Sequence, residues 1–320
     1  MAEQKSPLLL AVQFAGERKS DSFSEAFTDR DVINLNDGTH HPEIFHGVKY
    51  AIVWKPDAKL FARLPDLEII FSAGAGVDHI LQSKDVPDLP IVRFVDPTLT
   101  TRMSEWVCLQ CLSHLRQTKQ YDASQSKQNW NERPQPEAKE ITVGVMGLGI
   151  LGQDAARKLK MLGFTVIGWS RTKKQIDGVE CFDQSEIDTF LAHCHFVVGL
   201  LPLTPDTKGF YNRPLFLKLK SHPEIATPIF INGGRGGSQV ETDIISCLED
   251  GILGGVSLDV FEQEPLSLDS PLWSHPAAII TPHVAASSDA TAISHHVNRQ
   301  IQRYEAGEPL EHLVDRQIGY

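Results

Sequence analysis

Short apolar runs recur through the first part of the chain, and each is bounded by glycine, proline or aspartate. They cover residues 8–14, 49–54, 67–73 and 90–94. Continuous apolar runs of this length are typical of parallel strands buried on both faces of an α/β sheet. A long helical pattern follows over residues 103–129. It leads into the connector NERPQPEAKE, whose polar and proline-containing composition is typical of a domain boundary.

A second α/β series begins after this connector. The strand EITVGVMGLG runs into glycines, and the helical pattern DAARKLKMLG follows it. Five more runs of strand length occupy residues 164–169, 195–202, 228–234, 254–261 and 278–284. A final helix is expected to end near Gly307. The pattern predicts two doubly wound α/β domains with a ligand-binding cleft between them, because strand ends of such sheets bind ligands.

Composition limits the possible partners of this 320-residue chain. The 41% hydrophobic and 22% charged residues are ordinary for a globular protein, and the formal net charge of −11 argues against nucleic-acid binding. Five scattered cysteines suit a reducing compartment, and we expect Cys108 and Cys111 to be small apolar residues on one helix face. The apolar run near the N-terminus is too short for a signal peptide or a membrane span. We therefore expect a cytoplasmic protein without a membrane segment.

The sequence GLGILG at residues 147–152 matches the GxGxxG pattern of dinucleotide-binding loops. It directly follows a β-branched run and directly precedes a helical pattern, which is the context that this motif requires. Gly147 would form the tight turn, Gly149 would let the backbone approach a pyrophosphate, and Gly152 would allow close helix packing. Since free N–H groups at the helix N-terminus bind phosphates, we expect a dinucleotide here. The alternative is a simple turn.

The segment GWSRTKK at residues 168–174 indicates which dinucleotide binds. An acidic residue about twenty positions after the glycines normally holds the ribose of NAD, but this segment offers hydroxyls and cations. A carboxylate would repel the 2′-phosphate of NADP, whereas an arginine can form charge-assisted bonds to it. We therefore expect NADPH to be preferred over NADH; the alternative is a basic surface turn. The candidate phosphate contacts are Ser170, Arg171, Thr172 and Lys173, with Lys174 adding positive potential.

Three further stretches lie at predicted strand ends, and each taken alone has an ordinary structural interpretation. They are NGGRGG at residues 232–237, LDVFEQEP at residues 258–265 and TPHVAA at residues 281–286. Arg235 could lie in a surface loop, Glu264 could be a solvated charge, and His283 could be a satisfied histidine. In this order, and after a dinucleotide-binding loop, they form a specific combination.

Together these motifs resemble the D-2-hydroxyacid dehydrogenase family, from SAGAGVDHI near residue 72 to the C-terminus. VWKP, SPLWSHP and the ending LVDRQIGY resemble the glyoxylate/hydroxypyruvate reductase A subfamily. The resemblance implies a homodimer in which each chain has a flavodoxin-like substrate-binding domain and a Rossmann-like NAD(P)-binding domain. We assign residues 1–102 and 290–320 to the first domain and residues 103–289 to the second.

The resemblance also implies a catalytic set of Arg235, Glu264 and His283, and the residue types suit reduction of a 2-oxo acid. His283 would donate a proton to the carbonyl oxygen, because histidine titrates near neutral pH. Glu264 would favour the protonated ring and fix its orientation. Arg235 would hold the substrate carboxylate and polarise the carbonyl. The remaining substrate contacts would be Ala75, Gly76 and Val77 through their N–H groups, with Trp54 and Trp273 bounding the pocket or lying in the core.

The same resemblance places further cofactor contacts along the second domain. Asp259 would contact the nicotinamide end, although a structural acid at a strand end is the alternative. The loop LPLTPDT would pass under the adenosine part of the cofactor. The expected contacts outside the 168–174 segment are Gly147, Gly149, Ile150, Leu151, Gly152, Pro202, Thr207, Gly233 and Asp259.

Some positions depart from the family pattern. His195 stands where relatives have an aspartate, and Gly234 replaces the small apolar residue before the arginine. His193, Cys194 and His195 suggest a metal site, but neighbouring residues of a strand face opposite ways, so we expect no metal. The sequence THHPE at residues 39–43 is likewise expected to be a polar loop.

The sequence therefore predicts an NADPH-dependent reductase of small 2-oxo acids, with glyoxylate and hydroxypyruvate as substrates. Two alternatives remain open at this point. One is the same chemistry on a larger 2-ketoacid. The other is a dinucleotide-sensing corepressor, because such relatives can keep the arginine, glutamate and histidine.

Overall fold

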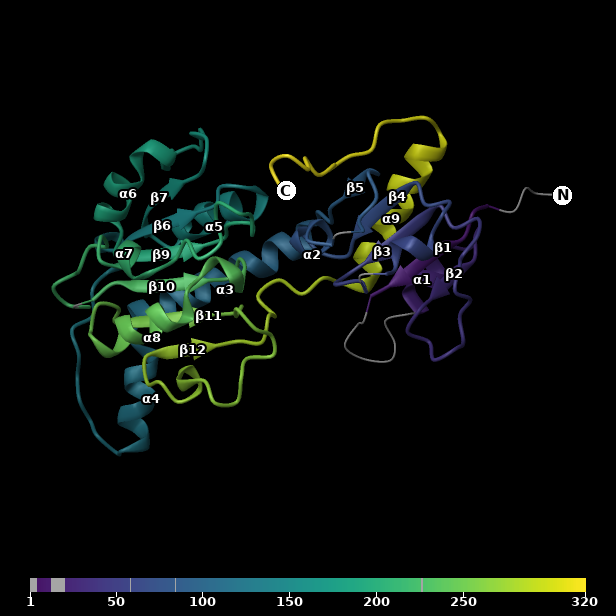
Figure 1. Ribbon diagram of the computed structural model, residues 1–320. Helices are drawn as coiled ribbons and strands as arrows, with labels where there is room; N and C mark the ends of the chain where they lie inside the picture. The colour runs from purple at the N-terminus through teal and green to yellow at the C-terminus, as the bar shows by residue number, and fades with distance from the viewer. Residues whose placement is uncertain (1–4, 13–20, 58, 84, 226) are drawn as a thin grey trace. The chain divides into compact units, whose positions relative to one another are not determined.

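The computed structural model describes residues 5–12, 21–57, 59–83, 85–225 and 227–320 (Figure 1). The chain divides into two compact units. Unit 1 comprises residues 1–99 and 288–320, and unit 2 comprises residues 100–287. The first division falls inside helix α3 (Pro97–Leu115) and the second falls just before helix α9 (Ala290–Glu305).

Unit 1 contains a parallel five-stranded sheet in the order β2-β1-β3-β4-β5. This 2-1-3-4-5 order is that of flavodoxin-like folds, as expected. The strands are β1 (Leu8–Ala11), β2 (Val32–Asn34), β3 (Tyr50–Val53), β4 (Ile69–Ser72) and β5 (Ile91–Val92). The helices of this unit are α1 (Asp21–Ala26), η2 (Phe61–Arg63), α2 (Asp78–Leu81) and α9. Every residue of β3 and β4 is buried, which explains their continuous apolar sequences. Residues 13–14, at the end of the expected first strand, lie outside the described part.

Unit 2 contains a parallel seven-stranded sheet in the order β12-β11-β10-β9-β6-β7-β8 (Figure 1). The order reverses between β6 and β9, which is the switch point of a Rossmann fold. The strands are β6 (Thr142–Met146), β7 (Thr165–Trp169), β8 (Glu180–Phe182), β9 (Phe196–Gly199), β10 (Ile229–Asn232), β11 (Gly255–Leu258) and β12 (Ala278–Ile280). The helices are α4 (Thr118–Ser126), η3 (Ala138–Glu140), α5 (Ile150–Met161), η4 (Gln184–Glu186), α6 (Ile187–His193), α7 (Arg213–Phe216), η5 (Gly236–Ser238), α8 (Glu241–Glu249) and η6 (Pro271–Trp273).

Two apolar clusters cover the two faces of this seven-stranded sheet. Val143 and Val145 of β6 belong to the cluster that includes α5, whereas Met146 belongs to the other. In β10, Ile231 belongs to the cluster that includes α5, and Phe230 belongs to the other. Because successive side chains of a strand point to opposite faces, β6 and β10 each supply both clusters. This is why the unit 2 strands are apolar throughout rather than alternating.

The prediction of one helix over residues 103–129 is wrong in its bounds. Helix α3 begins six residues earlier at Pro97, a residue whose fixed φ suits the first turn. The chain then breaks at Gln117, which has a left-handed φ of 54°, and α4 follows. The Gln117 side chain donates to the Pro134 carbonyl at 2.6 Å, which ties the break to the connector. Cys111 is buried and Cys108 packs beside it in a core cluster, as expected.

Candidate active site

Glu264 and His283, the expected catalytic pair, follow β11 and β12 respectively. Nδ1 of His283 lies 2.9 Å from Oε2 of Glu264, and the other Glu264 oxygen accepts from the Phe261 N–H at 3.3 Å. His283 has a φ of 54°, in the left-handed region that few non-glycine residues adopt. Such backbone strain is typical of functional sites. Both side chains remain partly exposed.

Asp259, at the end of β11, holds the segment that carries His283. One carboxylate oxygen accepts from the Thr281 hydroxyl at 2.6 Å and from the Val284 N–H at 2.9 Å. The other accepts from the Ala285 N–H at 2.9 Å. The Asp259 residue is only 1% exposed, and its main-chain carbonyl accepts from the His283 N–H at 2.8 Å. This geometry favours the structural alternative for Asp259 over the expected contact with nicotinamide.

Arg235 lies in the loop after β10, partly buried, with Nη1 donating to the Gly234 carbonyl at 2.9 Å. The buried Asn232 side chain shapes this loop: it donates to the Arg235 carbonyl at 3.1 Å and accepts from the Gly234 N–H at 2.9 Å. Gly236 lies so close to the backbone of Phe261 that a Cβ would come within 1.9 Å of its carbonyl oxygen. The Arg235 loop is thereby packed against the segment that holds Glu264.

Gly234 does not loosen this loop, although it departs from the family pattern. A Cβ at this position would lie 3.0 Å from the Leu201 carbonyl oxygen, which is tight, and the Gly234 backbone is hydrogen bonded through both its N–H and its carbonyl. Gln239 and Trp106 also support the site: Gln239 accepts from Asn232 at 2.8 Å, and the Trp106 indole donates to the Thr281 hydroxyl at 3.1 Å. The sequence analysis did not identify these two residues, because nothing in their local sequence marks them.

The glycine loop connects β6 to α5 as expected. Gly147 has a φ of 104°, and a Cβ there would lie 2.6 Å from the Leu200 carbonyl oxygen. A Cβ on Gly152 would lie 1.9 Å from the Gly147 carbonyl oxygen, so glycine is required for α5 to pack this closely. By contrast, a Cβ on Gly149 would meet open space. Ile150 and Leu151 begin the helix at this open position, where no side chain caps its N-terminus. The loop thus fits a phosphate approaching the backbone.

The candidate 2′-phosphate segment is a turn after β7. Ser170 is buried and its hydroxyl donates to the Thr172 carbonyl at 2.8 Å, so it is engaged within the turn. Arg171 and Thr172 are exposed. Lys173 is paired with Glu186 at the end of η4, with Nζ 2.9 and 3.1 Å from the two carboxylate oxygens. The hydrogen bond from Lys173 lowers the pKa of Glu186.

The loop after β9 and the turn after β10 complete the expected cofactor contacts. The Thr207 hydroxyl donates to the Pro202 carbonyl at 2.6 Å and accepts from the Thr204 N–H at 2.8 Å, so it closes the loop on itself. Gly233 is buried, and its N–H donates to the Gly199 carbonyl at 3.2 Å. These two loops follow β9 and β10, so they lie at the same sheet edge as the glycine loop.

The expected substrate contacts in unit 1 follow β3 and β4. Trp54 is partly buried; its ring lies 4.3 Å from the His79 ring, and a Cβ on Gly74 would come within 2.4 Å of it. The Ser72 hydroxyl donates to the Gly76 carbonyl at 3.0 Å and shapes the turn that also carries Ala75 and Val77. In unit 2, Trp273 is 53% exposed and its indole donates to the Ser267 carbonyl at 2.9 Å. Neither tryptophan is a core residue of its unit.

His195 connects two neighbouring strands of the unit 2 sheet. It lies at the start of β9, and its Nδ1 accepts from the Thr142 N–H of β6 at 2.9 Å. Burial lowers the pKa of His195 to about 4, with smaller contributions from Lys220 and His222. In the THHPE loop, Asp37 accepts from Thr39 and lies 3.2 Å from His41, which closes a polar turn. Among the described residues, no group of three His, Cys, Asp or Glu side chains is arranged to hold a metal.

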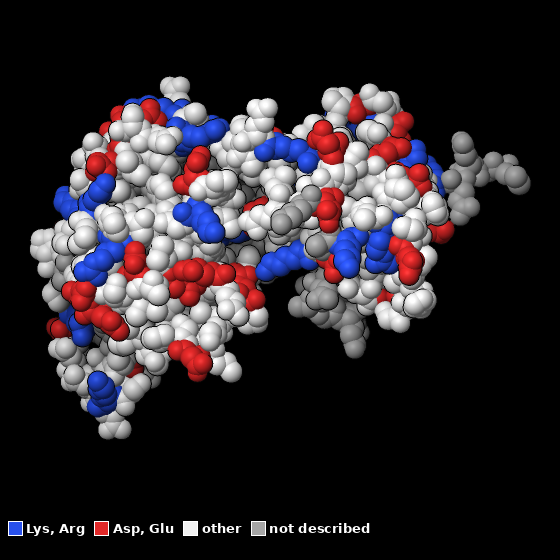
Figure 2. All heavy atoms as spheres, viewed as in Figure 1, with Lys and Arg blue, Asp and Glu red and all other residues white. Residues whose placement is uncertain are grey.

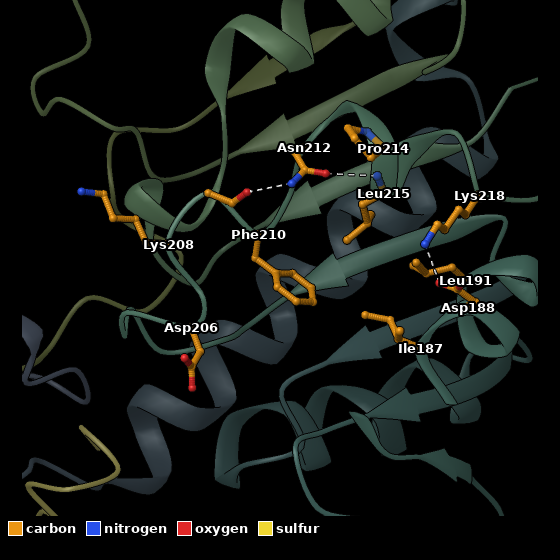
Figure 3. Close-up of a pocket in the computed structure, with 11 residues that line it drawn as sticks. Ile187, Asp188, Leu191, Asp206, Lys208, Phe210, Asn212, Pro214, Leu215 and Lys218 are labelled. Carbon is orange, nitrogen blue, oxygen red and sulfur yellow. Dashed lines mark hydrogen bonds and ion pairs between the residues drawn. The ribbon is translucent and has the colours of Figure 1, made fainter. Parts of the chain in front are cut away.

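A shallow pocket of about 360 Å³ lies between α6 and residues 206–218, which include α7; neither Glu264 nor His283 lines it (Figure 3). Ile187, Leu191, Phe210 and Leu215 point into it, and the Lys218–Asp188 pair lies at one end. On the face shown in Figure 2, acidic and basic side chains are interspersed and no continuous basic stripe crosses the surface. Within the described part of the chain, no helix has the length and apolar character needed to cross a membrane.

Comparisons with known proteins show what the chain is similar to. The model of the NAD-binding domain of D-isomer specific 2-hydroxyacid dehydrogenases matches residues 108–285. Glyoxylate/hydroxypyruvate reductase A of Escherichia fergusonii is 34% identical over 307 residues, which cover 94% of this chain and 95% of that protein.

Two solved structures extend the comparison. The NADPH-dependent glyoxylate/hydroxypyruvate reductase of Sinorhizobium meliloti, in complex with NADP and sulfate, is 55% identical with a TM-score of 0.96, covering 99% of this chain and all of that chain. A probable 2-hydroxyacid dehydrogenase of Rhizobium etli, in complex with NADP, HEPES and L(+)-tartaric acid, is 55% identical with a TM-score of 0.93 and the same coverage.

Proposed function

Because the chain belongs to the D-isomer specific 2-hydroxyacid dehydrogenase family, we propose that it reduces glyoxylate and hydroxypyruvate with NADPH. The observation that carries this proposal is the Glu264–His283 pair, whose side chains meet at 2.9 Å on a strained segment held by Asp259. The Arg235 loop is packed against this segment through Gly236. An acid, its orienting carboxylate and a fixed cation are the groups that reduction of a 2-oxo acid requires.

Each catalytic residue has a role that follows from its contacts. Nε2 of His283 donates the proton to the carbonyl oxygen, because Nδ1 is turned to Glu264. Glu264 orients the His283 ring and keeps its plane fixed, since one carboxylate oxygen lies 2.9 Å from Nδ1 and the other is anchored by Phe261. Arg235 binds the substrate carboxylate and polarises the carbonyl, and its planar fork provides two donors at once. When bound, NADPH supplies a hydride to the carbonyl carbon.

The cofactor site proposed for NADPH uses the switch point of the unit 2 sheet. The open space above Gly149 and the uncapped N-terminus of α5 receive the pyrophosphate. Arg171 covers the 2′-phosphate, assisted by the other residues of its turn. The full proposed set is Gly147, Gly149, Ile150, Leu151, Gly152, Ser170, Arg171, Thr172, Lys173, Pro202, Thr207 and Gly233, with Asp259 acting through the His283 segment.

The proposed substrate contacts besides Arg235 and His283 are Trp54, Ala75, Gly76, Val77 and Trp273. Trp54 is held against Gly74 and His79, so its ring cannot easily move aside. A bulky aromatic bounding the substrate site favours acids of two or three carbons over a larger 2-ketoacid.

The decisive experiment is a panel of 2-oxo acids assayed with NADPH and with NADH, following nicotinamide absorbance. We expect reduction of glyoxylate and hydroxypyruvate, with higher kcat/KM for NADPH. Ser170→Asp combined with Arg171→Ala should move the preference toward NADH, because the carboxylate repels the 2′-phosphate and accepts from a ribose hydroxyl. Equal efficiency with both cofactors in the unmodified protein would contradict the phosphate assignment. Binding of NADPH without reduction of any 2-oxo acid would favour a dinucleotide sensor.

We also propose that the protein is a cytoplasmic homodimer. All five cysteines are free and four of them are buried, which suits a reducing compartment. Trp130, in the connector after α4, is 95% exposed, and Leu109 on α3 is 59% exposed. Large exposed apolar side chains of this kind are typical of interfaces. Light scattering coupled to size-exclusion chromatography measures the mass directly, and a monomer at micromolar concentration would contradict the proposal.

A further inference from the structure

The turn that follows β7 carries a cation that is already paired. Lys173 contacts both carboxylate oxygens of Glu186, at 2.9 and 3.1 Å. Glu186 also accepts from the Asp183 N–H at 3.1 Å, in a capping box that fixes its side chain at the end of η4. The Glu186 carboxylate is thus held beside the candidate 2′-phosphate segment. Its partner, Lys173, lies two residues after Arg171.

An acid in this place has a definite electrostatic effect. It neutralises one of the cations that would otherwise attract a 2′-phosphate, and its own charge opposes the approach of a dianion. The hydrogen bond from Lys173 lowers the pKa of Glu186, and the same bond raises the pKa of Lys173. Both groups therefore stay charged at neutral pH.

The energetic cost of opening this pair is small. The Lys173 side chain is 56% exposed and the Glu186 side chain is 37% exposed. Exposed ion pairs of this type contribute little net stability, so a phosphate that carries more charge than a carboxylate can replace Glu186 as the partner of Lys173.

We propose that Glu186 is a specificity-determining residue that competes with the cofactor 2′-phosphate for Lys173. The inference rests on the proposed function, since it assumes that NADPH places its phosphate on the 170–174 turn. Lys173, which is paired with Glu186, exchanges this partner for the phosphate when the cofactor binds. The acid thereby weakens the binding of 2′-phosphorylated cofactors and leaves the binding of NADH unchanged.

The test is direct binding to the complete protein, measured by calorimetry with adenosine 2′,5′-bisphosphate and with 5′-AMP. Glu186→Gln removes the charge but keeps an oxygen for the Asp183 N–H, so the capping box remains. We expect this variant to bind the bisphosphate about two- to fivefold more tightly, the range of an exposed ion pair, with 5′-AMP unchanged. The gain should shrink at high salt.

Two further variants separate the contact from a general effect of charge. Asp188→Asn removes one negative charge from the neighbouring helix α6, where Asp188 pairs with Lys218 at 2.5 Å instead. It should leave the bisphosphate affinity within experimental error of the unmodified protein. Glu186→Gln in a Lys173→Ala background should give much less of the gain, because the cation that the phosphate would recruit is missing.

The possible outcomes distinguish this inference from the proposed function. If the unmodified protein binds the bisphosphate no better than 5′-AMP, the phosphate site itself is misplaced and both proposals fail. If it prefers the bisphosphate and Arg171→Ala removes that preference, the phosphate site stands. In that case, an unchanged or weakened bisphosphate affinity in Glu186→Gln overturns the competition alone. An equal gain in Asp188→Asn overturns it as well.

Discussion

Asp259→Asn tests whether this buried acid positions His283 or contacts the nicotinamide. The carboxylate accepts three hydrogen bonds, from the Thr281 hydroxyl and from the Val284 and Ala285 N–H groups. An asparagine can keep its oxygen on the first two donors, but its NH₂ group then faces the Ala285 N–H. One charge-assisted bond is lost and a buried donor is left unsatisfied, a cost of about 2–4 kcal/mol.

The same substitution should reduce turnover, because the displaced segment carries His283, the proposed proton donor. A misplacement of about 1 Å can cost on the order of 10²-fold in rate, so we expect kcat to fall about 10- to 100-fold. Affinity for NADPH should change little, since Asp259 is only 1% exposed.

Urea unfolding, steady-state kinetics and calorimetry measure the three quantities separately. Asp269→Asn, in an exposed loop of unit 2, is the matched control and should leave all of them unchanged. A large loss of NADPH affinity with undiminished stability would refute the positioning role and support a contact with nicotinamide.

Three further predictions follow from the same contacts. His283→Asn should lower kcat about 10²–10⁴-fold with little change in NADPH binding, because it removes the proton donor; near-native turnover would mean that another group is the acid. Arg235→Lys should raise KM for glyoxylate and lower kcat, since an ammonium cannot reproduce the two-point contact of a guanidinium; unchanged kinetics would refute its placement. Burial lowers the pKa of His195 from 6.5 to about 4, so the unfolded chain takes up the proton first as the pH falls. The free energy of unfolding should therefore decrease as the pH falls from 6.5 towards 4, by about 2 kcal/mol at about pH 5. In urea unfolding, His195→Asn should remove this contribution and the exposed His193→Asn should not; equal pH profiles for both would contradict the assignment.

The sequence by itself determined the class of fold and the elements that carry the chemistry. Strands buried on both faces are mostly apolar along their length, so β3, β4, β9 and β10 could be recognised in the sequence as continuous apolar runs. Gly147 and Gly152 of the loop after β6 are required because the backbone passes close to each of them, which is a local property of strand, turn and helix. Arg235, Glu264 and His283 could be selected because each follows such a run within a recognisable motif.

Short or half-exposed elements could not be read in this way. Strands β2 and β8 have three residues each, and no apolar run marked them. They are strands only because a neighbouring strand offers them hydrogen-bonding partners. The break at Gln117 is similar, since the Pro134 carbonyl that accepts from its side chain lies seventeen residues away along the chain.

Only the tertiary structure decided which side chains hold another side chain in position. Asp259 and His283 are separated by twenty-four positions, yet three donors around His283 converge on one buried carboxylate. Lys173 and Glu186 are likewise brought together from two consecutive loops of the Rossmann fold. Local sequence can identify a charge and the kind of element that carries it. The partner of that charge depends on which strand ends lie side by side in the sheet. Only the folded chain therefore shows whether a charged side chain is available to a ligand or is already paired.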